Sequence, residues 1–120
     1  MRYILLIYSR ENEIGRCDPI EEKRIRTLHR AVMEEARRCK VFRGGEPLHP
    51  TFTATTVTVR SENVRIADGP FAGTDQQLAG YYILDCDNLD EAIKWATKVL
   101  TSCKGEEGCI EIRPIADILE

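Results

Sequence analysis

The chain has 120 residues, of which 42% are hydrophobic and 31% charged, the composition of an ordinary soluble globular protein. This length predicts one domain, residues 1–120, with a core that needs neither disulfides nor metal. The formal net charge of −3 argues against a nucleic-acid partner, because phosphate backbones are bound by clustered positive charge. The basic residues between positions 23 and 40 alternate with glutamates, which is typical of a solvated helix face.

The cysteine pattern bears on metal sites and disulfides, and the first residues of the chain bear on the location of the protein. The five cysteines are odd in number and lack CxxC spacing, so neither a zinc site nor a disulfide framework is predicted. Cys39 and Cys86 occupy apolar periodic positions and are expected to be buried, whereas a bridge between Cys103 and Cys109 stays open. The apolar run near the start is too short to span a bilayer and has no cleavage site, which predicts a cytoplasmic protein without membrane contact.

The first half of the chain predicts a strand, a long helix and a short strand. Residues 3–8 are apolar on both alternating faces, as in a central strand. Asp18 as N-cap and Pro19 in the first turn begin a helix that runs to about Lys40, with one apolar stripe. Residues 41–43 form a short strand that Gly44 and Gly45 stop. This unit predicts a right-handed crossover with parallel strands.

The second half predicts a hairpin followed by a second strand, helix and strand. Residues 53–59 and 64–67 are antiparallel partners around a turn at 61–63, and Asp68 ends the second strand. Residues 69–77 form a loop and 78–85 a strand. Asp87 or Asn88 caps a helix with a box-like pattern to Glu91, and residues 109–114 form the last strand.

This order predicts an α+β protein with a ferredoxin-like, split β-α-β fold and an inserted β-hairpin. Both helices lie on one face of a mainly antiparallel sheet, which leaves the other face bare. In a chain of this size a second copy is the simplest cover, so a homodimer is expected.

Seven short motifs also follow one another along nearly the full length. They are Tyr3-Ile4-Leu5-Leu6-Ile7-Tyr8, Gly44-Gly45-Glu46-Pro47-Leu48, Ala54-Thr55-Thr56-Val57, Asp68-Gly69-Pro70-Phe71, Gly80-Tyr81-Tyr82, Leu89-Asp90-Glu91-Ala92 and Glu111-Ile112-Arg113-Pro114-Ile115. With these motifs the whole chain resembles the YCII-related proteins, and among them the branch named after its Asp-Gly-Pro-Phe motif. The resemblance departs from that branch at Gly73, where a Glu is expected, and at Ala79, where Gly is frequent.

The resemblance implies a ferredoxin-like subunit that dimerises face to face, as in the dimeric α/β-barrel superfamily. It implies no defined activity, although some members of the branch are associated with extracytoplasmic-function sigma factors, which points to regulation. The wider group has a proposed His–Asp pair with its His on the first helix, and His29 lies in the corresponding part of this chain.

Asp68 and His29 are the candidate catalytic pair. A histidine titrates near neutral pH, and a carboxylate can orient the imidazole and fix its tautomer. The structural alternatives are that Asp68 only caps the turn at Gly69 and that His29 is a partly buried residue at the edge of the stripe.

Candidate ligand-binding residues lie in two loops and one strand. Glu46 and His49 bracket a proline-containing loop that either lines a cleft opposite Asp68 or rigidifies a strand connection. Tyr81 and Tyr82 point to opposite faces of their strand, so one packs in the core and the other lines a pocket or the dimer seam. The complete set of candidates is Glu46, His49, Gly69, Pro70, Phe71 and Tyr82.

Two functions follow from these observations. The first is a ligand-binding or regulatory module with a small-molecule ligand and a functional link to a sigma factor. The alternative is a small enzyme that performs acid–base chemistry on an organic substrate with the His–Asp pair. The chain matches no nucleotide-binding, flavin or metal motif, so no cofactor and no metal are expected.

Overall fold

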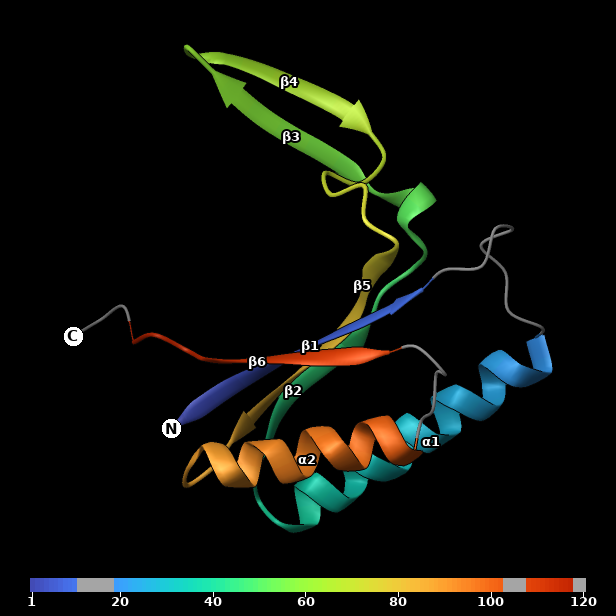
Figure 1. Cartoon of the computed structure of the whole chain (residues 1–120), viewed down its shortest axis with the longest axis vertical. Helices are drawn as coiled ribbons and strands as arrows, with labels where there is room; N and C mark the ends of the chain where they lie inside the picture. The colour runs from blue at the N-terminus through green and yellow to red at the C-terminus, as the bar shows by residue number, and fades with distance from the viewer. Residues whose placement is uncertain (11–18, 103–107, 118–120) are drawn as a thin grey trace.

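The computed structural model describes residues 1–10, 19–102 and 108–117 (Figure 1). The elements are β1 (Arg2–Arg10), α1 (Pro19–Arg38), β2 (Phe42–Pro47), a 3-10 turn η1 (Thr51–Thr53), β3 (Thr55–Arg60), β4 (Asn63–Asp68), β5 (Gln76–Asp85), α2 (Leu89–Ser102) and β6 (Cys109–Pro114). Asp18, the predicted N-cap, lies outside the described residues. Cys103, whose bridge to Cys109 was left open, also lies outside them.

The predicted ferredoxin-like α+β fold is confirmed. Four strands form one sheet in the order β2-β5-β1-β6, and β3 pairs with β4 in a separate two-stranded sheet. Both β1 and β2 pair antiparallel with β5, so they run parallel to each other with β5 between them, as a split β-α-β unit requires. Both helices cover one face of the four-stranded sheet (Figure 1).

The core lies between this face and the two helices. Its buried residues are Tyr3, Leu5, Val32, Ala36, Val41, Tyr82, Leu84, Cys86, Ala92, Ala96 and Val99. Alternation along the strands leaves the second face of the sheet to Ile4, Leu6, Tyr8, Tyr81 and Ile83, which are only partly buried. The described chain therefore has a largely apolar sheet face that no element of its own covers.

The end of α1 corrects the expectation for Cys39. Lys40 adopts a left-handed φ of 63°, and Val41 N–H donates to the Ala36 carbonyl at 3.0 Å. This is the hydrogen bond of a Schellman motif, in which a left-handed residue ends the helix. Because the helix ends at Arg38, Cys39 lies in the turn and is exposed, whereas Cys86 is buried as expected.

The start of α2 confirms the predicted capping pattern. Asn88 Oδ1 accepts the N–H of Glu91 at 2.9 Å, so Asn88 is the cap. Glu91 Oε2 in turn accepts the N–H of Asp87 at 2.9 Å, one residue before the cap. Together the two side chains accept hydrogen bonds from two backbone N–H groups at the start of α2.

The prediction that Gly44 and Gly45 stop the strand was wrong. β2 continues through them to Pro47 and pairs with β5, with a register irregularity between Phe42 and Gly44. A Cβ on Gly45 would lie 2.9 Å from the Tyr81 carbonyl oxygen, and one on Gly80 would lie 2.9 Å from the Glu46 carbonyl oxygen. Glycine is required at both positions because the two backbones approach so closely.

The hairpin β3–β4 is formed as predicted, and it projects away from the four-stranded sheet (Figure 1). The segment after it was predicted as a loop to residue 77, but β5 begins at Gln76. Gly69 has a φ of 102°, as expected for the turn, and its N–H donates to the Ala54 carbonyl at 2.8 Å. This bond and the one from Thr56 Oγ1 to the Gly69 carbonyl close the base of the hairpin.

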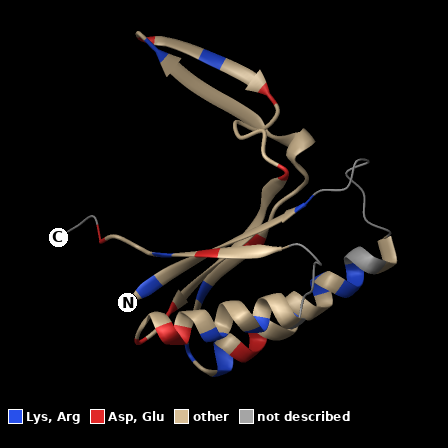
Figure 2. Ribbon diagram, in the orientation of Figure 1, with Lys and Arg blue, Asp and Glu red and all other residues tan. Residues whose placement is uncertain are grey.

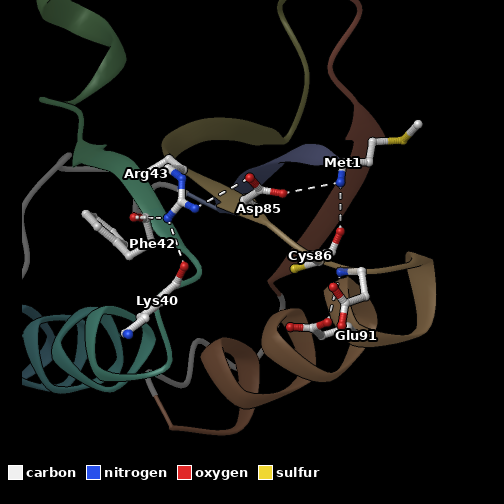
Figure 3. A network of polar contacts seen from close by, with 8 residues as sticks. Met1, Lys40, Phe42, Arg43, Asp85, Cys86 and Glu91 are labelled. Carbon is white, nitrogen blue, oxygen red and sulfur yellow. Dashed lines mark hydrogen bonds and ion pairs between the residues drawn. The ribbon is translucent and has the colours of Figure 1, made fainter.

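A polar network ties together three segments that are distant in sequence (Figure 3). The Asp85 carboxylate, at the end of β5, lies 3.2 Å from the Met1 amino group and 3.5 Å from Arg43. Arg43 also donates to the Lys40 carbonyl at 2.9 Å and to the Phe42 carbonyl at 3.1 Å. The network fixes the turn from α1 into β2 against the central strands.

Replacement of Gly80 with alanine is expected to destabilise the fold by about 1–3 kcal/mol, because a methyl group there meets backbone that must move. Urea denaturation of Gly80→Ala measures the loss. The matched control is Gly44→Ala in the neighbouring strand, whose Cβ would meet nothing within 4 Å. Equal stability of Gly80→Ala and the wild type would contradict the close approach of β2 and β5.

Candidate active or ligand-binding site

A cavity of about 420 Å³ opens between α1 and the strands β2 and β5. Helix α1 contributes one long face to it, and the strands contribute the opposite wall. The lining residues are Ile7, Arg26, His29, Arg30, Met33, Glu34, Arg37, Gly45, Glu46, Pro47, Ala79, Gly80 and Tyr82.

The strand wall of the cavity consists largely of small residues. Gly45 and Gly80 have no side chains, and Ala79 and Pro47 have short ones. The same two glycines allow the close pairing of β2 with β5. The local sequence that lets these strands approach therefore also leaves the space between the sheet and α1 unfilled.

The least exposed polar side chains that line the cavity are those of His29 and Tyr82. His29 Nδ1 and the Tyr82 hydroxyl are 2.5 Å apart, a hydrogen bond whose donor depends on the histidine tautomer. The two rings are nearly perpendicular, at 87°, with centroids 5.9 Å apart. Tyr82 is buried in β5 and His29 is half-buried on α1, so the bond joins the two walls of the cavity.

Burial lowers the pKa of His29 from its ordinary value of 6.5, since desolvation disfavours the imidazolium. His29 is therefore a neutral imidazole at neutral pH. In the tautomer in which Nδ1 accepts from Tyr82, Nε2 carries a hydrogen and donates, and in the other tautomer Nε2 accepts. The ring can thus hydrogen-bond either a donor or an acceptor without changing its charge.

Charged side chains surround the outer part of the cavity. Arg26, Arg30 and Arg37 lie on one face of α1 at helical spacing, together with Glu34. Glu46 lies opposite on β2, and all five side chains are exposed. The Arg37 guanidinium is stacked 4.6 Å from the centre of the Phe42 ring, which holds it at the edge of β2. Figure 2 shows how positive and negative residues alternate along the helices.

The structure brings together three of the predicted site residues, His29, Glu46 and Tyr82. The others, Asp68, His49, Gly69, Pro70 and Phe71, do not line this cavity. Asp68 is the last residue of β4, paired with Thr55 in the projecting hairpin. Within the described part of the chain, His29 is bonded to Tyr82 and the Asp68 carboxylate forms no hydrogen bond or ion pair.

The other lining residues, among them the three arginines, Met33 and the two glycines, were not predicted from the sequence as site residues. A signal for the helix residues existed, because positions 26, 29, 30, 33 and 37 share one face of an α-helix beside the apolar stripe. The alternation of charges suggested only a solvated face.

Neither a metal cluster nor a membrane-spanning helix is found in the part of the chain that the structure describes. No three His, Cys, Asp or Glu side chains are grouped as metal ligands there. None of the helices within the same residues is sufficiently long and apolar to cross a bilayer.

The buried state of His29 predicts a pH-dependent stability. A histidine whose pKa is lowered by folding binds fewer protons when folded than when unfolded, so stability falls as the pH drops through about 6.5. Wild-type protein is expected to lose more stability between about pH 7.5 and pH 5.5 than His29→Gln. Thermal unfolding at both pH values measures the difference.

His49→Gln is the matched control, because it removes the other histidine and leaves His29 in place. This variant should retain the wild-type pH dependence. If His29→Gln and the wild type lose equal stability on acidification, His29 does not sit neutral in a buried site.

Comparison with known proteins identifies the family of the chain. The model of the YCII-related domain family matches residues 1–119. An uncharacterized protein of Rhizobium meliloti (strain 1021) is 32% identical over 120 residues, which cover 97% of this chain and 93% of that protein. Since the family match extends over nearly every residue that forms the fold and the cavity, this chain belongs to the YCII-related domain family.

Proposed function

We propose that this protein is a small-molecule-binding module whose site is the cavity between α1, β2 and β5. The observation that carries the proposal is the pair His29–Tyr82, two hydrogen-bonded polar groups in a cavity whose strand wall consists largely of small residues. A neutral, oriented imidazole of this kind recognises a ligand group by hydrogen bonding.

The cavity has the properties of a ligand site. Pockets for small molecules have volumes of about 300–1,000 Å³ and combine apolar walls with a few placed polar groups. This cavity measures about 420 Å³. Ile7, Met33 and Pro47 supply apolar contacts, and His29 and Tyr82 supply the polar ones.

We also propose that the functional form is a homodimer. The sheet face formed by β1 and β5 opposite the helices carries apolar side chains and has no cover in the described part of the chain. The radius of gyration is 16.1 Å, whereas a compact chain of this length has about 14 Å. A second copy would bury the exposed face and make the assembly more compact.

The hairpin supports a dimer independently. Val57 pairs with Ile66 and Val59 with Val64, so the four aliphatic side chains share one face, and each is more than 60% exposed. A two-stranded hairpin alone is only marginally stable in water. In the proposed dimer the second copy packs on this face as well.

An acid–base enzyme is the second candidate, and the hydrogen bond between His29 and Tyr82 favours it. A neutral imidazole is a competent general base. The expected partner Asp68 does not reach this cavity from its own subunit, so a His–Asp pair would need the Asp68 of a second copy. The regulatory role, the sigma-factor link and the cytoplasmic location rest on the sequence and its resemblance alone.

The homodimer predicts a defined effect of one substitution. Leu6→Arg, on the uncovered sheet face, should convert the protein to a monomer, because the dimer would bury an unpaired charge. Analytical ultracentrifugation at micromolar concentration measures the mass. Ile93→Arg, an equal change on the exposed side of α2, should remain dimeric. A monomeric wild type would refute the dimer.

Ligand binding predicts chemical-shift changes at the cavity. In an NMR screen with neutral, anionic and cationic small molecules, a binding compound should perturb the amides of Gly45, Gly80 and Tyr82. Ala79→Leu should abolish this binding, because the larger side chain occupies the cavity. Ala67→Leu, at an exposed position on β4, should bind as the wild type does. The absence of any compound that perturbs these amides would contradict the proposal.

A further inference from the structure

We infer that the ligand of this cavity is an organic acid with a single carboxylate, an apolar body and an uncharged polar group at its far end. The inference rests on the proposed binding function and assigns its ligand class. It follows from the residues that line the cavity together: exposed charged side chains, apolar side chains, and the less exposed neutral pair His29 and Tyr82.

The charge at the cavity mouth is opposite in sign to that of the whole chain. The formal net charge of the protein is −3. Among the side chains that line the cavity, the three arginines nevertheless outnumber the two glutamates. A positive mouth on an acidic protein attracts anions toward this site.

Arginine suits a carboxylate ligand by geometry as well as by charge. The planar guanidinium donates two parallel hydrogen bonds to the two oxygens of a carboxylate. Arg30 lies one turn after Arg26 and next to His29 on the cavity face of α1. Within the described residues Arg30 forms no hydrogen bond or ion pair, so its donors are available to a ligand.

The two glutamates limit the charge of the ligand. Glu34 lies one helical turn from Arg30, and Glu46 lies across the cavity on β2. Neither carboxylate forms an ion pair within the described part of the chain. They repel a second negative charge, so the mouth is suited to a monoanion rather than to a phosphate dianion.

The inner end of the cavity selects an uncharged group. The His29 imidazole is neutral and is bonded to Tyr82, and neither residue offers a charge to pair with an ion. A charged group there would lose hydration without compensation. A hydroxyl or carbonyl group can instead exchange a hydrogen bond with His29 Nε2.

The apolar residues that line the same cavity complete the ligand description. Ile7 and Met33 approach from the sheet and the helix, and Gly45 and Gly80 present only backbone. Met33 is flexible and polarisable, so it adapts to ligands of different shape. A planar ring or a short hydrocarbon chain fits between the two walls.

Isothermal titration calorimetry with matched probes tests the ligand class. The probes are 4-hydroxybenzoate, 4-hydroxyphenylacetate and levulinate, each compared with its uncharged amide, and phenyl phosphate as the dianion. At least one acid is expected to bind about tenfold or more tightly than its amide and than the phosphate. Arg30→Gln should reduce the affinity for that acid about tenfold and leave the affinity for its amide unchanged.

Arg38→Gln is the matched control, since it makes the same change on the same helix at an exposed residue outside the cavity. It should bind the acid like the wild type. Amides that bind as well as their acids, or a phosphate that binds more tightly, would overturn the monocarboxylate assignment while leaving the binding function intact. Failure of every acid, amide and neutral compound to bind would remove the function together with the assignment.

Discussion

The close approach of β2 and β5 is the constraint on which the rest of the structure depends. Gly45 and Gly80 come from distant parts of the chain. A Cβ on either glycine would lie 2.9 Å from a backbone carbonyl oxygen of the other strand, so neither position accommodates a Cβ without movement. This contact adds β2 to the edge of the sheet. It also leaves a wall of largely small residues under α1, so the pairing of the strands and the existence of the cavity have the same cause.

The sequence predicted elements whose signals are local, and it failed where the decisive neighbour is remote. The capping of α2 by Asn88 depends on residues within one turn and was predicted. The continuation of β2 through Gly45 depends on β5, so a pair of glycines was interpreted as a strand end. One local feature was missed as well: Cys39 was placed on the buried stripe because the residue that ends α1 with a left-handed φ is Lys40 and not a glycine.

In the candidate site, too, the sequence indicated the residue types but not which residues meet in space. Residue type identified His29, Glu46 and Tyr82 as candidates, since each carries a group that chemistry uses. Their meeting in one cavity follows from the crossing of α1 over β5, and His29 and Tyr82 are 53 positions apart in the sequence. Asp68 was selected for its turn motif, but this turn lies at the base of a hairpin that leaves the sheet away from the helices, and Asp68 does not line the cavity (Figure 1). A local motif cannot reveal the direction in which a long hairpin leaves the sheet.

The arrangement of the cavity places two electrostatic effects on His29 in opposition. Burial favours the neutral imidazole, whereas a carboxylate bound nearby would favour the imidazolium. The exposed arginines that line the cavity would hold the proposed anion and offset its charge. In the proposed complex His29 would therefore remain a neutral hydrogen-bonding group while the arginines hold the anion. Because one cavity holds both charged arginines and a neutral hydrogen-bonded pair, a single site can distinguish the carboxylate of a small acid from its uncharged polar end.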